Sequence, residues 1–156
     1  MRLETIADMF ADILNIDDVY AGNIDSNLDK CIGVYNAKNQ GAYKMALGGK
    51  PCTKTHEKKI SILIHWTDNP TIAEQKANEI IDVVSSVRNY DTTKRQYLIA
   101  KDGKAVATAF GKKISLKSEQ DFILNFLRCN TPVSVGRDER GICEYVIEAK
   151  IYYQTI

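Results

Sequence analysis

Residues 60–87, ISILIHWTDNPTIAEQKANEIIDVVSSV, contain a strand pattern followed directly by a helix pattern. Alternate residues of a β-strand point to the same side of a sheet. In the first part of this stretch, these alternate residues are all apolar: Ile60, Ile62, Ile64 and Trp66. We therefore expect residues 60–66 to form a strand in the core of the protein, with Trp66 at the end of its buried face.

The second part of the stretch changes to the spacing of a helix. Pro70 suits the first turn of a helix, and Thr71 with Glu74 three residues later matches a capping box. The apolar residues that follow lie on one helical face: Ala73, Ala77, Ile80, Ile81, Val84 and Val87. A helix of about 17 residues should pack on the sheet through this face, with Ile80 in the core.

Towards the N-terminus, the pattern indicates another helix and another strand. Residues 3–14 repeat apolar side chains at helical spacing, and Cys31 to Tyr35 is short, apolar and β-branched. The polar stretch 15–30 between them is predicted to be a long connection. Residues 48–51, Gly-Gly-Lys-Pro, mark a turn.

Towards the C-terminus, two hairpins are predicted. Asp102-Gly103 lies between two strand-like segments within Gln96 to Phe110, and Asp-Gly is a favoured two-residue hairpin turn. A polar, glycine-bounded turn at 136–141 should join residues 132–135 to a long final strand. One face of that strand is formed by alternate residues: Cys143, Tyr145, Ile147, Ala149, Ile151 and Tyr153.

Residues 122–127 fit both a helical face and an alternating strand, so their periodicity leaves the two open. The other patterns together predict an α+β protein. Its architecture would be a single mixed, largely antiparallel sheet flanked by two principal helices. The length of 156 residues is typical of one domain, so residues 1–156 are expected to form one.

The composition is that of a globular protein, with 44% hydrophobic and 26% charged residues. No apolar run approaches the roughly 20 residues that span a bilayer, so no membrane association is expected. The first ten residues, MRLETIADMF, lack the apolar centre and cleavage site of a secretory signal. Folding in the cytoplasm is therefore expected.

The residues that usually carry catalysis or bind metals form no recognisable site. The four cysteines are scattered without a C-x-x-C pair: Cys31, Cys52, Cys129 and Cys143. They are expected to be buried or half-buried thiols. His56 lies in a lysine-rich stretch expected to be a loop, and His65 ends a core strand, where a hydrogen-bonded structural role is expected. No metal, no cofactor and no enzymatic activity are predicted.

Two further features have the residue types of a site but not its environment or spacing. The paired carboxylates Asp17-Asp18 and Asp138-Glu139 lie in turn-like segments, where solvation is expected to keep them ordinary acids. The glycines at 48 and 49 do not have the spacing of a phosphate-binding loop.

The charge is unevenly distributed, although the whole chain carries only +1. Residues 1–30 hold seven acidic and two basic side chains, a local balance of −5. Residues 94–117 hold seven basic side chains and one acidic, a balance of +6. Such runs are often only solvated faces.

Several segments resemble the tail terminators, minor capsid proteins of tailed bacteriophages. They are Cys31 to Tyr35, Ala46 to Gly49, Ile60 to Trp66 with the helix after Pro70, and Pro132 to Gly141 with the final strand. The resemblance covers roughly residues 30–90 and 130–154. It also favours a strand over a helix at residues 122–127.

This resemblance implies a structural virion protein without catalytic residues. Its members would form a hexameric ring that caps the tail tube, stops tube polymerisation and joins the tail to the head connector. The implied partners are other copies of the chain, the tail-tube protein and the connector, with transient contact to DNA in the channel. The implied location is the head–tail interface of the virion, after assembly in the host cytoplasm. Two alternatives stay open: a head completion or connector protein, and a small nucleic-acid-binding α+β domain.

The opposed charges suggest where copies of the chain would meet. A head-to-tail contact needs two different complementary patches, which the acidic 1–30 and basic 94–117 segments could supply. Alternatively, the basic hairpin around Asp102-Gly103 lines the channel and faces DNA. The predicted interface residues are Lys101, Lys104, Lys112, Lys113, Arg137, Asp138 and Arg140.

Overall fold

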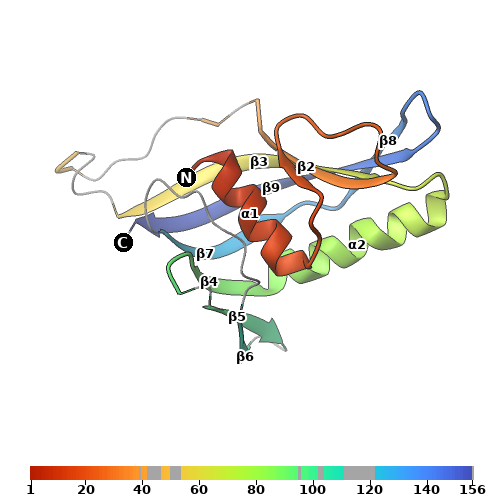
Figure 1. Ribbon diagram of the computed structural model, residues 1–156. Helices are drawn as coiled ribbons and strands as arrows, with labels where there is room; N and C mark the ends of the chain where they lie inside the picture. Colours follow the sequence, from red (N-terminus) through yellow and green to blue (C-terminus); the bar gives the residue numbers. More distant parts are fainter. Residues whose placement is uncertain are drawn as a thin grey trace.

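The computed structural model describes residues 1–38, 40, 41, 47–49, 54–94, 96–101, 104–110 and 122–155, and for 101 and 104–110 the backbone alone. Its elements follow one another along the chain as α1 (Leu3–Leu14), β1 (Val19–Ala21), β2 (Lys30–Asn36), β3 (Thr55–Trp66), α2 (Pro70–Ser86), β4 (Val87–Asp91), β5 (Gln96–Lys101), β6 (Lys104–Phe110), β7 (Phe122–Cys129), β8 (Val133–Arg137) and β9 (Cys143–Thr155). The fold is α+β, as the patterns predicted, with both helices on the same face of the sheet (Figure 1).

The strands form one mixed, mostly antiparallel sheet. Its order is β1-β2-β3-β9-β7-β4-β5-β6, and β8 pairs with β9 beside this path. Only the pairing of the short β1 with β2 is parallel among the described strands. The long strands β3 and β9 lie at the centre, paired in register from Thr55 with Gln154 to His65 with Glu144.

Strands β7 and β8 lie one after the other along β9. β7 pairs with residues 149–155 of β9, and β8 pairs with residues 143–146. Residues 122–137 therefore run antiparallel to the final strand as one long hairpin. Its β8 end extends beyond the rest of the sheet (Figure 1). The predicted hairpin with its turn near 136–141 is confirmed.

The core lies between the helices and the sheet. The fully buried side chains of β3 are Ile60, Ile62 and Ile64, the apolar face that the alternation predicted. They pack in one hydrophobic cluster with residues of both helices, among them Ile6, Met9, Phe10, Ala77, Ile80 and Val84. Trp66 was also predicted to be core, but it is only partly buried. It lies at the strand end, where Lys30 and Lys76 place their ammonium groups over the ring at 5.5 and 5.0 Å from its centroid.

Three local predictions are wrong. The connection 15–30 contains a strand, β1, which three backbone pairings with β2 create in a sequence too short to show periodicity. Helix α2 is capped by Asn69 and not by a box at Thr71, because the Asn69 side chain accepts hydrogen bonds from the amides of Thr71 and Ile72. His56 lies within β3 and stacks on Tyr153, where a loop was expected.

Residues 122–127 are a strand, which confirms the reading favoured by the resemblance. The hairpin between residues 96 and 110 is also confirmed, because β5 pairs with β6 up to Lys101 and Lys104. The Asp102-Gly103 turn itself lies outside the described residues, as do Lys50 and Pro51 of the predicted 48–51 turn. Strand β4, which directly follows α2, was not predicted.

Candidate functional site

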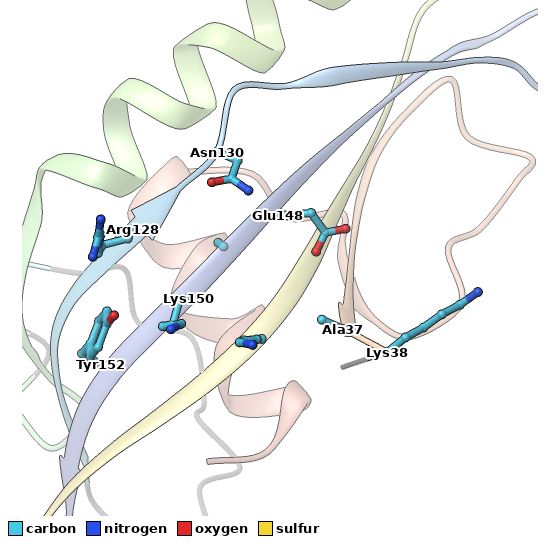
Figure 2. Close-up of a pocket in the computed structure, with 9 residues that line it drawn as sticks. Ala37, Lys38, Arg128, Asn130, Glu148, Lys150 and Tyr152 are labelled. Atoms are coloured by element: carbon cyan, nitrogen blue, oxygen red, sulfur yellow. The ribbon is translucent and has the colours of Figure 1, made fainter. Parts of the chain in front are cut away.

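The face of the sheet opposite the helices carries a row of three basic side chains. Lys150 of β9 pairs in register with Lys59 of β3 on one side and with Arg128 of β7 on the other. We call these three residues the basic row. Lys38, which follows β2, lies across β3 from Lys150, and its side chain extends away from it (Figure 2). The basic row and Lys38 line a hollow of about 480 Å³ with Asn130, Glu148 and Tyr152.

Strand geometry places these charges together. Residues directly opposite on neighbouring strands have their side chains on the same face about 5 Å apart, and like charges at such positions are destabilising. Lys150 has an acidic neighbour, Glu57, at 3.6 Å from ammonium nitrogen to carboxylate oxygen. Among the described residues, Lys59, Arg128 and Lys38 have no ion pair. The row therefore carries excess positive charge.

Two further chemical features lie in or beside the hollow. Both carboxylate oxygens of Glu148 accept from the Ser61 hydroxyl, at 2.7 and 2.8 Å. The Glu148 carboxylate is therefore held between β9 and β3. Phe126 stacks on Tyr152 with ring centroids 4.6 Å apart, although 36% of Phe126 is exposed. A partner with carboxylates or phosphates and some apolar surface would fit this lining.

At the other end, the same face is covered by the loop between β1 and β2. Gly33 lies under this loop: a Cβ there would come within 2.6 Å of Ile24 Cγ2 and 2.7 Å of the Tyr35 ring. Arg140 holds the loop from the β8–β9 turn, donating to the Ser26 carbonyl at 2.8 Å and to the Asp29 carboxylate at 2.6 Å. This end of the face is therefore covered, whereas the region of the basic row forms an open hollow.

This covered end of the sheet is acidic. A second hollow there is lined by Asp18, Asp29 and Asp68 together with Lys30 and Arg140. The acidic residues at or near this end outnumber the basic ones by eight to four. The eight acids are Asp17, Asp18, Asp25, Asp29, Asp68, Asp138, Glu139 and Glu144, and the four bases are Lys30, Lys76, Arg137 and Arg140. We call this set the acidic end.

Within the acidic end, the fold aligns a cysteine, a histidine and a carboxylate across three strands. Cys31 pairs in register with His65, and His65 with Glu144. The buried imidazole has the Glu144 carboxylate 3.4 Å from Nδ1 and the Asp138 carboxylate 3.5 Å from Nε2. The expected structural role of His65 fits this enclosed position. Asp138, expected to be solvated, instead faces this ring and accepts from the amides of Arg140 and Ile142.

The alignment does not make Cys31 a nucleophile. Burial, with the nearby charges of Asp18, Asp25 and Glu144, raises the pKa of its thiol to about 11. Its S–H group points to the Asp25 carbonyl, with sulfur and oxygen 3.7 Å apart. A catalytic cysteine needs the opposite, a lowered pKa in electropositive surroundings.

The raised thiol pKa values predict slow alkylation. Burial also raises the pKa of Cys129 to about 11. In the native protein, the pH profile of iodoacetamide labelling of Cys31 and Cys129 should therefore have its midpoint near pH 11, because the thiolate is the reacting form. In urea, the midpoint of both should shift to about pH 9. Since the unfolded thiols lose protons first, stability should fall as the pH rises between these values. Peptide mass spectrometry over a pH series measures the labelling, and native labelling with a midpoint near 9 would contradict the burial argument.

Some classes of site can be excluded for the described ranges. No group of three or more His, Cys, Asp or Glu side chains there could hold a metal ion. No helix in those ranges has the length and apolar character needed to cross a membrane.

Comparison with known families decides the identity. The family model described as "Bacteriophage tail terminator protein" matches residues 4–155, nearly the whole chain. The chain belongs to the bacteriophage tail terminator family. Tail terminators are structural, non-enzymatic proteins of the phage tail, and membership implies contact with the tail tube. The resemblance seen in the sequence is thereby confirmed.

Two other comparisons add little to the tail terminator assignment. One solved structure, whose name describes no function, covers 98% of this chain and 89% of its own at 9% identity, with a TM-score of 0.41. So low a TM-score supports no conclusion about fold or function. No protein with a curated description matches the chain.

The predicted interface residues of this tail terminator lie in two places. Lys101 at the end of β5 pairs with Lys104 at the start of β6. Lys112 and Lys113 lie outside the described residues. The other three lie in the β8–β9 hairpin. Arg137 donates to the carbonyls of Asp68 and Gly141, each at 3.0 Å, and Arg140 and Asp138 make the contacts given above. Whether any of the seven contacts another subunit stays a prediction.

Sequence reasoning missed the basic row. Its members lie 69 and 22 residues apart in the chain, each at an outward position of its strand, so no motif links them. The strand assignment was the available signal, because it placed Lys150 on the outward face of β9. The correct register with the neighbouring strands would then have identified Lys59 and Arg128 as its neighbours.

Proposed function

We propose that this tail terminator assembles into a closed ring, a hexamer, that caps the tail tube and ends its polymerisation. The single observation that carries the proposal is the family match over residues 4–155. The head connector would bind the opposite side of the ring. We also propose that the whole chain acts as one domain, since one sheet and one hydrophobic cluster account for its described elements.

Native mass spectrometry of the full chain tests ring formation. The expected result is a discrete species at six times the mass of the 17.5 kDa chain, alone or after addition of tail-tube ends. Monomers under both conditions would contradict the ring. Tube capping is tested separately: tubes polymerised with the protein should stop growing, and phage lacking it should make tails of abnormal length. Free tails of normal length beside leaking heads would instead indicate a head completion protein.

A further inference from the structure

We propose that the acidic end of one copy docks on the basic row of the next, so that this contact links neighbouring subunits head to tail. The inference rests on the proposed ring and names the surfaces that would hold it together. It differs from a contact through the basic segment 94–117, because none of the basic-row residues belongs to that segment.

The first argument is the unbalanced charge on the open face. Lys59, Lys150 and Arg128 are direct cross-strand neighbours, an arrangement that opposes folding of the isolated chain. Only Lys150 has an acidic partner nearby among the described residues. An acidic partner from outside the chain would relieve the repulsion. Four basic residues and one acidic residue line the hollow, so its net charge is positive and complements an acidic partner.

The second argument is that the chain carries the complementary surface at its other end. Lys59 and Trp66 are seven residues apart on β3, which at about 3.3 Å per residue separates the two regions by roughly 23 Å. A single copy cannot bring its own acidic end onto its own row, because both lie on the same rigid strands. Two different complementary patches on one chain are what a heterologous contact requires, and closure of that contact by rotation gives a ring.

The third argument favours a second copy over DNA as the occupant. Glu148 lines the same hollow as the basic row, and Glu57 lies beside Lys150. A continuous phosphate backbone crossing this face would pass close to both acids. A compact cluster of carboxylates can instead contact the basic row without approaching these two acids. The acidic end also offers exposed carboxylates without an ion pair in the described structure, those of Asp68 and Glu139.

A charge swap tests the contact in the full chain. The row variant carries Lys59→Glu and Arg128→Glu, and the acidic-end variant carries Asp68→Lys and Glu139→Lys. Each should assemble at least about tenfold more slowly than wild type at low salt, since complementary charge chiefly accelerates association. The variant with all four substitutions restores opposite charges and should recover most of the rate. A control with Glu74→Lys and Asp82→Lys, which lie on the exposed side of α2, should assemble like wild type.

Misfolding can be separated from a lost contact. The row variant places two glutamates beside Lys150 and removes the like-charge row, so its thermal midpoint should be no lower than that of wild type. Slow assembly with an intact midpoint, together with recovery in the fourfold variant, would establish the contact.

Other outcomes overturn the proposal in distinguishable ways. Wild-type rings with unchanged assembly of both variants would reject this contact but leave the ring in place. Unchanged assembly with weaker duplex DNA binding by the row variant would assign the row to DNA. If the wild-type protein instead forms salt-sensitive open chains of subunits, and both variants abolish them, the contact is correct but the ring does not close. A wild-type protein that stays monomeric with tail-tube ends would reject both.

Discussion

Replacement of Ile80 by alanine should lower the free energy of unfolding by about 2–5 kcal/mol. Ile80 is completely buried in the middle of α2, within the cluster that joins both helices to the sheet. Truncation removes buried apolar surface and leaves a cavity, because surrounding residues on rigid strands can relax only partly. Urea unfolding, followed by circular dichroism, measures the change as a lower midpoint at an unchanged slope.

Ile72 provides the matched control on the same helix. It is 46% exposed, so Ile72→Ala should change stability by no more than about 0.5 kcal/mol. If Ile80→Ala cost as little as this control, the packing of α2 on the sheet would be wrong.

The second large effect is expected from Tyr90→Phe, at about 1–3 kcal/mol of lost stability. The Tyr90 hydroxyl donates to the Asp12 carboxylate with 2.5 Å between the oxygens, and both residues are buried. The bond joins α1 to β4 across 78 positions of sequence. Its loss would leave a buried carboxylate with one donor fewer, which costs more than an ordinary exposed hydrogen bond. Denaturant unfolding of the variant gives the value directly.

A double-mutant cycle with Asp12→Asn isolates this pair. The two changes should couple by about 0.5–3 kcal/mol, because each removes part of the same interaction. Tyr152→Phe is the control, since the half-buried Tyr152 lies on the open face and should lose almost nothing. Additive effects of Tyr90→Phe and Asp12→Asn would show that the hydroxyl and the carboxylate do not stabilise each other.

Much of the fold could be predicted because its periodic segments are long. The alternation in β3 and β9 and the helical spacing in α1 and α2 report which side chains are buried, and burial of apolar surface is the main force in folding. Periodicity gives no answer at two places. β1 has three residues, and residues 122–127 fit two periods at once, so partner strands decide both.

The candidate site was less predictable than the fold. Asp138 looked like a solvated turn residue, but the β8–β9 turn folds it against His65, 73 positions earlier in the chain. Arg140 was correctly placed in a polar turn, yet its bond to Asp29 spans 111 positions and could not be read from local sequence. Such contacts depend on which strand ends meet.

By itself, the sequence determined the class of the protein. The apolar alternation, the two helical faces and the glycine-bounded turns specify an α+β sheet protein, because each depends on residues close together in the chain. Only the tertiary structure decided which outward-facing charges become neighbours. Strand order and register align Lys59, Lys150 and Arg128, and the fold brings Asp18, Asp29 and Asp68 together at the other end. Sheet pairing is non-local: a shift of one strand's register by one residue would move its basic side chain to the opposite face.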